Sequence, residues 1–429
     1  MHRRPPLILV IVAVAVVAAL LWFLTDDRLV GVAATLDRDG SGALEPDEVG
    51  PVIDRAFARV DADGSGGIDG VEFRRWVLGQ WLSGATAPLA VPPVPERPTE
   101  EDLRAWLRAP VTAGDLAGVA LLVLVDGEVV FRHAEGDLEP DVAVPLASAS
   151  KWPAATVLGC LQDRGEVDLS RPVGTFAPAV PSTWAELTPE QLLSHTAGTP
   201  ARHVLGVTPD TSVATVGRDL VRTTRPEAPG TVFRYGGEAM QVAGWWAEVR
   251  GRHPWRRLFV ECLAWPLSLD SAAWGHPLAG PSATGFADIG AGLYMSLDDY
   301  GAFLSMLQQE GRYGGVRNLD ARTIAFMERD RAGALPREEL PPAADAAWGY
   351  ALGAWCERVD EDGRCTSLSS PGALGAYPWL DREREVAGVL LVVDSLPRVV
   401  AWERATRQLV ERLYGRAIIS GARRRPQGG

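Results

Sequence analysis

Lysine is almost absent from this chain of 429 residues. The sequence carries 42 basic side chains, and all of them are arginine except Lys151. An arginine guanidinium stays charged at any biological pH, whereas a buried lysine amine can lose its proton and act as a base. The single lysine therefore indicates a chemical role that arginine cannot fill.

Several catalytic signatures are missing as well. No Gly-x-Ser-x-Gly occurs, which argues against the α/β-hydrolase fold, and neither His-Glu-x-x-His nor Cys-x-x-Cys supports a catalytic zinc. The net charge of -13 argues against nucleic acid as a partner, because binding phosphates requires a basic surface. With 47% hydrophobic residues the chain can still bury a substantial core.

One long apolar run stands near the N-terminus. Residues 7–24, LILVIVAVAVVAALLWFL, follow Arg3 and Arg4, and a helix of that length spans roughly 27 Å. We expect residues 1–25 to form a cytoplasmic stub and a transmembrane anchor, with the rest of the chain periplasmic or at the cell surface. The alternative is a cleaved signal peptide, whose apolar region usually runs about 7 to 15 residues.

The chain has four cysteines, which fit an oxidising compartment without requiring one. Cys356 and Cys365 flank a segment with Asp362-Gly363 at its turn, which predicts a disulfide across a hairpin; two free thiols are the alternative. Cys160 and Cys262 lie in apolar helical patterns and are expected to be buried small side chains.

Two stretches after the apolar run match each other, DRDGSGALEPDE (37–48) and DADGSGGIDGVE (61–72). They carry the calcium-loop pattern of EF-hands, with oxygen ligands on alternate residues, a glycine at the turn and a final glutamate. We expect residues 26–80 to be an all-α EF-hand pair holding two Ca²⁺ ions, in a structural or a regulatory role. The alternative is a pair of acidic turns that bind nothing. The expected ligands are Asp37, Asp39, Ser41, Glu45, Glu48 and the Ala43 carbonyl, then Asp61, Asp63, Ser65, Asp69, Glu72 and the Gly67 carbonyl.

The remaining chain divides into a Pro-rich linker (81–100), a globular domain (101–417) and a basic tail (418–429) that is expected to be disordered. In the domain, 118–136 reads as two strands joined at Asp126-Gly127, and further strand patterns appear only from residue 348 onward. A helix is expected over about 398–414, and mostly helical patterns fill 148–335. Strands at both ends predict an α+β fold, with an antiparallel sheet flanked by helices and a helical subdomain.

The lone lysine stands three residues after Ser148. On a helix this spacing places both side chains on one face within contact distance. A serine hydroxyl is a poor nucleophile unless a neighbouring base takes its proton, and a desolvated lysine can be that base. The pair therefore indicates nucleophilic acyl transfer.

The segment PLASASKWPAATVLGCLQDRGEVDLSRPV (145–173) resembles the first motif of the serine β-lactamase and penicillin-binding-protein group. The likeness is to the class C-like branch, which also contains esterases and D-amino-acid peptidases. Four further stretches agree in the same order: LTPEQLLSHTAGTP (187–200), PGTVFRYGGEAMQVAGWWAEVRG (229–251), GAGLYMSLDDYGAFLSML (290–307) and SSPGALGAYPWLDRE (369–383).

This resemblance implies a role for each matching residue. Ser148 would be the nucleophile and Lys151 its proton partner, and the Tyr235 phenol would shuttle the proton to the leaving group. The backbone N–H groups of Ser148 and Ala373 would form the oxyanion hole. The family's loop around His195 is structural, so a hydrogen-bonded loop histidine is expected there.

The sequence departs from the family in the substrate pocket. Gly237 stands where Tyr-x-Asn has its asparagine, and the third motif, normally Lys-Thr-Gly or His-x-Gly, reads Ser370-Pro371-Gly372. Both changes weaken the case for β-lactams and carboxylate-terminated peptides, so an esterase is favoured among serine hydrolases. The expected substrate is a small ester, amide or peptide. The alternative is a non-catalytic binding or sensor module that kept the fold.

Overall fold

The computed structural model describes residues 41, 43–45, 65–69, 87–175, 180–201, 211–277, 280–281, 285–341 and 344–415. The expected anchor (1–25), most of the EF-hand segment (26–80) and the basic tail (418–429) lie outside these residues. Within the part that is described, no helix combines the length and the apolar character needed to cross a bilayer.

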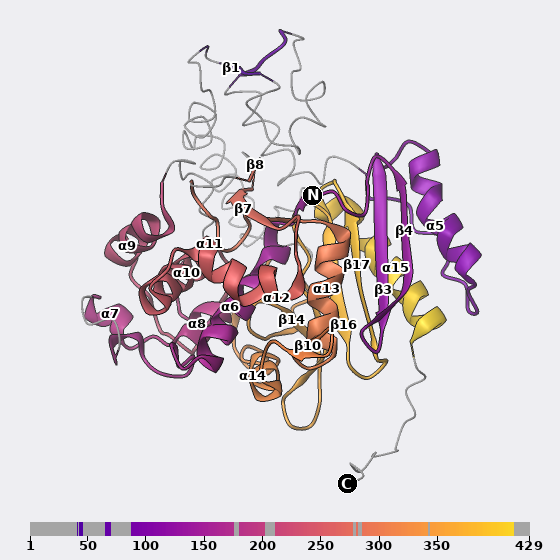
Figure 1. Cartoon of the computed structure of the whole chain (residues 1–429). Helices are drawn as coiled ribbons and strands as arrows, with labels where there is room; N and C mark the ends of the chain where they lie inside the picture. Colours follow the sequence, from indigo (N-terminus) through magenta and orange to yellow (C-terminus); the bar gives the residue numbers. More distant parts are fainter. Residues whose placement is uncertain are drawn as a thin grey trace, which may run out of the picture.

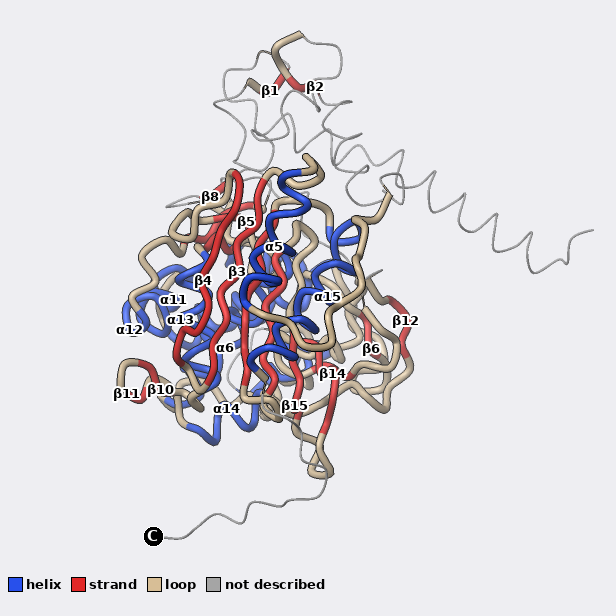
Figure 2. Tube along the Cα trace, turned by 90° about the vertical axis from the view of Figure 1, so that its right-hand side faces the viewer, coloured by secondary structure: helices blue, strands red, loops and turns tan. Residues whose placement is uncertain are grey.

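A seven-stranded antiparallel sheet forms the frame of the domain, and its strands come from both ends of the described chain (Figures 1 and 2). This arrangement confirms the α+β class. In spatial order the strands are β13 (Gly349–Tyr350), β14 (Trp355–Val359), β15 (Cys365–Ser369), β16 (Ala376–Asp381), β17 (Val386–Val392), β3 (Gly118–Val125) and β4 (Glu128–Gly136).

The hairpin between β3 and β4 turns where the sequence predicts it. Val125 pairs with Glu128, which leaves a two-residue loop, Asp126-Gly127. Both loop residues have positive φ, 52° and 83°, as a type I′ turn requires. The Gly127 N–H also donates to the Gln308 Oε1 at 2.8 Å, which ties the turn to the helix beneath it.

Helices cover both faces of the sheet. On one face lie α5 (Glu100–Thr112) and α15 (Leu396–Tyr414), whose Trp106 and Trp402 rings stack with centroids 6.4 Å apart. On the other face lie α13 (Leu297–Gln308) and α6 (Lys151–Asp163). Successive residues of a strand point to opposite faces, so β3 contributes to both cores and all of its residues up to Leu124 are buried.

The helical subdomain is inserted between β4 and β13, on the left of Figure 1. Every residue from Lys151 to Leu161 of α6 is buried, so α6 is the central helix of this part. Around it lie the 3-10 turns η1 (Ala147–Ser150) and η2 (Val173–Thr175), the π-helical turn η3 (Val260–Ala264), and the helices α7 (Ser182–Ala185), α8 (Pro189–Leu193), α9 (Val213–Thr223), α10 (Glu238–Gly251), α11 (Trp255–Phe259), α12 (Trp265–Leu267) and α14 (Ala321–Met327).

Short strands complete the fold. A four-stranded sheet runs in the order β5 (Val144–Pro145), β9 (Leu293–Met295), β7 (Ala273–His276) and β8 (Gly280–Pro281). Three smaller pairs are β12 (Arg337–Glu339) with β6 (Phe233–Arg234), β10 (Arg312–Tyr313) with β11 (Val316–Arg317), and β1 (Ala43–Leu44) with β2 (Ile68–Asp69).

The last part of the Pro-rich segment lies against the domain. Leu89 is buried in the core between α5, α15 and the sheet, and its N–H donates to the Arg398 carbonyl at 2.8 Å. Leu89 is therefore packed on the domain, within the segment 81–100 that the sequence predicts as a linker.

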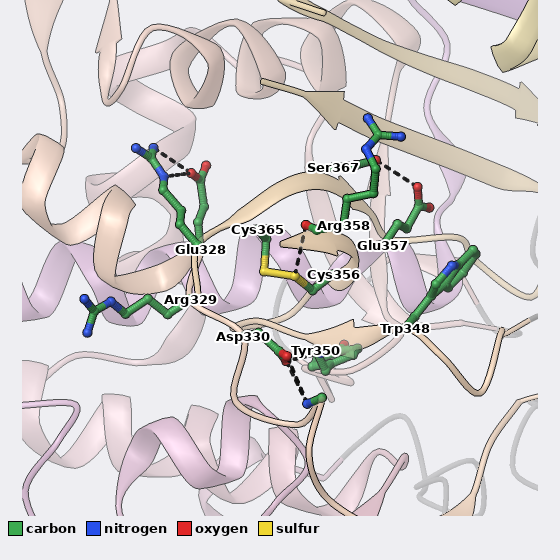
Figure 3. Close-up of a disulfide and its surroundings, with 12 residues drawn as sticks. Glu328, Arg329, Asp330, Trp348, Tyr350, Cys356, Glu357, Arg358, Cys365 and Ser367 are labelled. Carbon is green, nitrogen blue, oxygen red and sulfur yellow. Dashed lines mark hydrogen bonds and ion pairs between the residues drawn. A yellow bond between two sulfur atoms is a disulfide. The ribbon is translucent and has the colours of Figure 1, made fainter. Parts of the chain in front are cut away.

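All four cysteines are paired. Cys356 and Cys365 join β14 to β15 across their hairpin, as expected (Figure 3). Cys160 and Cys262 are buried in helical segments, as expected, but they also form a second disulfide that the sequence did not predict; it joins α6 to η3 across 102 residues of sequence. Both lie in apolar helical patterns, and only the packing of the two helical segments brings their sulfurs together.

Candidate active site

The backbone just before Ser148 is held in an uncommon conformation. Ala147 has a φ of 45°, in the left-handed region that residues with a Cβ rarely adopt. Two hydrogen bonds fix this turn, from Leu146 N to the Leu293 carbonyl at 3.0 Å and from Ala149 N to the Leu146 carbonyl at 3.1 Å. Ser148 is left half-buried between two buried alanines.

The Lys151 amine lies beside the Ser148 hydroxyl. The lysine is 1% exposed at the start of α6, and its Nζ lies 3.1 Å from the Ser148 Oγ. Nζ also donates to the Gly290 carbonyl at 2.8 Å, which fixes the direction of the side chain. This geometry allows the amine to take the proton of the hydroxyl.

Tyr235 joins this pair from the segment between β6 and α10. The Lys151 Nζ lies 4.9 Å from the centroid of the Tyr235 ring. Two aromatic rings also contact Tyr235. The Trp355 ring stacks on the Tyr235 ring with centroids 5.2 Å apart, and the centroid of the His195 ring lies 4.6 Å from that of Tyr235. Tyr235 is 8% exposed, so its position is set by packing.

His195 is a hydrogen-bonded loop residue, as expected. Its carbonyl accepts from the Arg234 N–H at 3.0 Å, and its ring Nδ1 accepts from the Gly236 N–H at 3.5 Å. Its φ of 58° gives the loop its bend. His195 thus supports the backbone on either side of Tyr235.

Gly237 and Gly290 approach each other next to the lysine. A Cβ on Gly290 would lie 3.5 Å from the Gly237 Cα and 3.5 Å from the Lys151 Nζ. Gly237 is also the N-cap residue of α10. Because Gly237 has no side chain, no amide group is presented to a substrate at this position.

The Ser370 hydroxyl is hydrogen-bonded to the backbone at Ser148 and Gly353. It donates to the Ser148 carbonyl at 3.3 Å and to the Gly353 carbonyl at 3.2 Å, and the residue is 3% exposed. It therefore connects the end of β15 to the turn that carries Ser148. This position provides no cation for a substrate carboxylate.

Gly372 packs directly on the same turn. A Cβ at this position would lie 2.0 Å from the Leu146 carbonyl oxygen, so only glycine fits. The next residue, Ala373, accepts from the Leu396 N–H at 3.0 Å, which anchors its peptide group to the start of α15. The approach of Gly372 places Ala373 close to the residues that precede Ser148.

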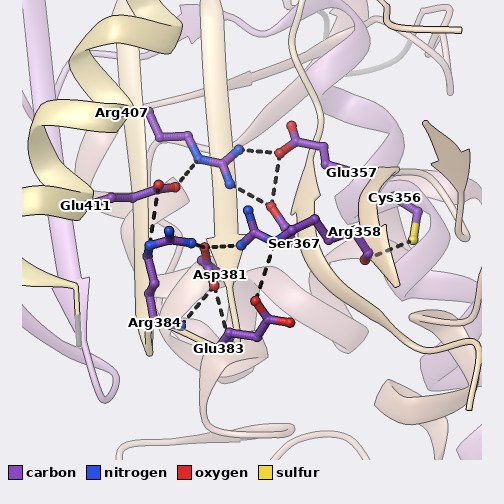
Figure 4. A network of polar contacts seen from close by, with 9 residues as sticks. All are labelled: Cys356, Glu357, Arg358, Ser367, Asp381, Glu383, Arg384, Arg407 and Glu411. Atoms are coloured by element: carbon purple, nitrogen blue, oxygen red, sulfur yellow. Dashed lines mark hydrogen bonds and ion pairs between the residues drawn. The ribbon is translucent and has the colours of Figure 1, made fainter. Parts of the chain in front are cut away.

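A buried polar network holds β15 from the opposite face of the sheet (Figure 4). Ser367 and Ser369 both donate to the Glu357 carboxylate, which also pairs with Arg407 of α15 at 2.7 Å. Burial alone would raise the pKa of Glu357, but Arg407 and the two hydroxyls hold it below its usual value. The network fixes the strand that leads into Ser370.

One residue of the site is absent from the sequence-based prediction. Asp288 is 2% exposed, and its Oδ1 accepts from the Gly290 N–H at 2.9 Å. Gln241 of α10 holds the same loop, because its side chain bonds Ala287 O at 3.3 Å and Ile289 N at 3.1 Å. The motif stretch noted in the sequence starts at Gly290, two residues after this carboxylate.

Some oxygens of the predicted calcium loops are described, and they converge. In the first loop Ser41 Oγ donates to the Ala43 carbonyl at 2.9 Å and to Glu45 Oε1 at 3.1 Å. In the second, Ser65 Oγ donates to the Gly67 carbonyl at 2.9 Å. The loops pair through β1 and β2, where Leu44 lies opposite Ile68 and both are buried. The side chains of the other expected ligands, Asp37, Asp39, Glu48, Asp61, Asp63, Asp69 and Glu72, lie outside the described part.

The oxygen atoms described in these loops are of the kinds that a calcium ion binds. Hydroxyl, carbonyl and carboxylate oxygens at alternate positions are the ligands that Ca²⁺ takes in such loops. Within the residues that the structure describes, no group of three or more His, Cys, Asp or Glu side chains could hold a metal.

A surface hollow of about 970 Å³ lies at the other end of α6 from Ser148, lined by residues that include Gln162, Glu166 and Arg250. Helix α6 has 13 residues and is therefore about 20 Å long. The hollow is consequently remote from the reactive pair.

A serine hydroxyl that faces a buried lysine amine, at the start of a helix packed against an antiparallel sheet, is the arrangement of a serine hydrolase of the Ser-x-x-Lys class. Residues 103–411 match the family model described as Beta-lactamase, and the chain belongs to this family. The family with this fold includes esterases and penicillin-binding-protein homologues.

Individual relatives are consistent with this assignment. The structure of a putative β-lactamase from Bacteroides dorei DSM 17855 is 30% identical, with a TM-score of 0.62 over 69% of this chain and 91% of that one. The structure of a family VIII carboxylesterase is 19% identical, with a TM-score of 0.57 over 75% and 99%. Protein Rv1367c of Mycobacterium tuberculosis (strain ATCC 25618 / H37Rv) is 29% identical over 107 residues, which is 24% of this chain and 27% of that protein. The chain thus matches about a quarter of the length of this curated relative.

Proposed function

We propose that this protein is an esterase that forms a covalent acyl intermediate on Ser148. The observation that carries the proposal is the 3.1 Å approach of the Lys151 Nζ, on a lysine only 1% exposed, to the Ser148 Oγ. Burial disfavours a charged amine, and a neutral amine is the form that can accept the hydroxyl proton.

In the proposed reaction the Ser148 oxygen attacks the carbonyl carbon of an ester while its proton passes to Lys151. The backbone N–H groups of Ser148 and Ala373 stabilise the negative oxygen that develops. The bond to the alcohol oxygen then breaks, and the leaving alkoxide receives a proton through the Tyr235 phenol. Water then attacks the carbonyl carbon of the acyl enzyme in the same way, which releases the acid and restores Ser148.

The preference for esters rests on what the pocket does not present. Gly237 offers no amide, and the Ser370 hydroxyl is engaged with two carbonyls instead of facing a substrate carboxylate. A small neutral ester does not need either group, whereas a β-lactam or a carboxylate-terminated peptide loses a partner. The likeness to a carboxylesterase structure supports the same preference.

The first test is intact mass after exposure of the full-length protein to a fluorophosphonate, which phosphonylates activated serines. We expect one adduct on the native chain and none on Ser148→Ala. Ser150→Ala is the matched control, because Ser150 lies on the same turn but its hydroxyl accepts from Leu293 N at 3.0 Å. An adduct that persists in Ser148→Ala refutes the assignment of the nucleophile.

We also propose that residues 26–80 bind two calcium ions as an EF-hand pair. The convergence of Ser41, Ala43 and Glu45 oxygens and the pairing of Leu44 with Ile68 support this proposal. Equilibrium dialysis of the full chain should give two bound ions, with one lost in each of Glu48→Gln and Glu72→Gln. Retention of both ions in either variant contradicts the ligand set.

We further propose a membrane-anchored protein whose hydrolase domain lies outside the cytoplasm. The apolar run 7–24 supports an anchor, and the two disulfides support an oxidising compartment. Protease added to spheroplasts should remove the domain, while a cytoplasmic marker stays uncut. A domain protected until the inner membrane is ruptured contradicts this topology.

A second candidate function is a non-catalytic binding or sensor module. Gly237 and the Ser370-Pro371-Gly372 sequence favour it, because they depart from the substrate-contacting motifs of the family. Ester turnover that disappears in Ser148→Ala excludes it. A folded chain that turns over no ester and forms no phosphonyl adduct supports it.

A further inference from the structure

Asp288 and Lys151 bind the two polar groups of one glycine, Gly290. Asp288 Oδ1 accepts from the Gly290 N–H at 2.9 Å, and the Gly290 carbonyl accepts from the Lys151 Nζ at 2.8 Å. A Cβ on Gly290 would lie 3.5 Å from each of these side-chain atoms, so they are at most about 7 Å apart. The carboxylate thus fixes the same peptide segment that orients the amine.

Both groups are removed from water. Asp288 is 2% exposed and Lys151 1% exposed, and a charge interaction at this separation is strong when solvent does not screen it. Burial raises the pKa of Asp288 to about 6, against the opposing effects of Lys151 and the N–H groups of Gly290 and Ala291. The carboxyl is therefore ionised above about pH 6.

Two other titratable groups lie near this loop, and neither acts on Asp288 as the charge of Lys151 does. Tyr235 lies just before α10, with its ring centroid 4.9 Å from the Lys151 Nζ. His276 lies on β7, where the neighbouring Gly275 carbonyl accepts from the Asp288 N–H at 3.1 Å. Lys151 is the charged side chain whose attraction acts on Asp288.

We propose that Asp288 is a positioning residue whose buried negative charge, together with its hold on Gly290, sets how readily Lys151 exchanges a proton with Ser148. A carboxylate next to an amine stabilises the protonated amine, so Asp288 opposes the desolvation that favours the neutral base. Asp288 therefore acts on the proton exchange between Lys151 and Ser148 through its charge and through Gly290. The inference rests on the proposed function for its catalytic meaning, while the charge coupling itself can be measured without turnover.

The chain offers an unusually direct test because Lys151 is its only lysine. Full-length protein grown with ¹³C-labelled lysine gives one side-chain signal, which must be absent from Lys151→Arg. The midpoint of its titration is expected to fall by about one to two pH units in Asp288→Asn, as two charges 7 Å apart give at an effective dielectric constant of about 20. An asparagine oxygen can still accept from Gly290 N, so the loop geometry is kept.

Asp299→Asn is the matched control. Asp299 is also a buried carboxyl, bonded by Ser271 Oγ at 2.6 Å, but the charges that act on it are Asp270 and Asp298. Its substitution should leave the Lys151 titration unchanged. Equal shifts in both variants, or no shift in Asp288→Asn, overturn the proposal.

The native protein provides a second measurement if Asp288→Asn does not fold. The Lys151 signal should show a smaller inflection near pH 6 as Asp288 gains its proton. A signal with no inflection between pH 5 and 7 overturns the proposal, as does an inflection that disappears in His276→Gln. A positive titration with no phosphonyl adduct upholds the coupling and refutes only the proposed function.

If both hold, the pH profile of Asp288→Asn should extend to lower pH. The acid limb of kcat/KM is expected to move in the same direction and by the same amount as the Lys151 titration. A purely structural role of Asp288 would lower activity equally at every pH and leave the limb in place.

Discussion

Replacing Lys151 by arginine tests the central role of this site most severely, because it keeps the positive charge and removes only the ability to lose it. In the native protein the Lys151 Nζ lies 3.1 Å from the Ser148 Oγ and 2.8 Å from the Gly290 carbonyl, and the residue is 1% exposed. A guanidinium is longer, planar and permanently protonated. It can bond the same carbonyl but cannot accept the Ser148 proton.

The size of the effect follows from what general-base catalysis contributes. Loss of a positioned base costs about 10²- to 10⁴-fold in rate, which is about 3–5 kcal/mol of transition-state stabilisation. We expect kcat/KM for a chromogenic ester to fall by this factor in Lys151→Arg and by a similar factor in Lys151→Ala. Retention of charge should bring no rescue.

The matched control is the opposite substitution, arginine to lysine, at an exposed position. The side chain of Arg322 is 91% exposed, so Arg322→Lys should leave kcat/KM within about twofold of the native value. Near-native turnover by Lys151→Arg, or activity clearly above that of Lys151→Ala at the same pH, excludes Lys151 as the base.

Three further predictions concern stability and the nucleophile turn. Glu403 is buried, its carboxyl oxygens have no hydrogen-bond partner in the described part of the chain, and burial holds its pKa well above the usual value. The folded protein therefore keeps a proton that the unfolded chain releases, so the free energy of unfolding falls as pH rises. Relative to Glu403→Gln, the free energy of unfolding of the native protein should decline by about 1.4 kcal/mol per pH unit above about pH 5. Urea unfolding at a series of pH values measures this decline. Gly372→Ala should abolish the phosphonyl adduct, because its Cβ would meet the Leu146 carbonyl at 2.0 Å. Replacing Cys160 and Cys262 by serine should lower the free energy of unfolding by about 3–5 kcal/mol, since the bridge closes a loop of 102 residues.

Each of these has an outcome that contradicts it. Parallel pH profiles for native protein and Glu403→Gln would mean that the carboxyl is not held protonated. A native rate of phosphonylation in Gly372→Ala would mean that the turn can move without affecting Ser148. An unchanged unfolding transition in the serine variant would mean that the Cys160–Cys262 bridge does not constrain the chain.

The local parts of this protein could be predicted from the sequence because their signals lie within a few residues. Asp126-Gly127 predicts the β3–β4 hairpin, since both residues accept the positive φ that a two-residue turn needs. The spacing of Ser148 and Lys151 places them on one helical face, and the structure puts their reactive atoms 3.1 Å apart. Helix α15 ends at Tyr414, within the expected range.

The class of fold and the contact between Ser148 and Lys151 could thus be predicted from the sequence. Tertiary structure alone decided the surroundings of that pair: the pairing of Cys160 with Cys262, the bonding of the Ser370 hydroxyl to the backbone, and the placement of Asp288 beside Lys151. These contacts join segments about 100 to 220 residues apart, and no periodicity or spacing encodes them. They arise only when the sheet and the helical subdomain pack together and exclude water from the space between α6 and the loop at Gly290.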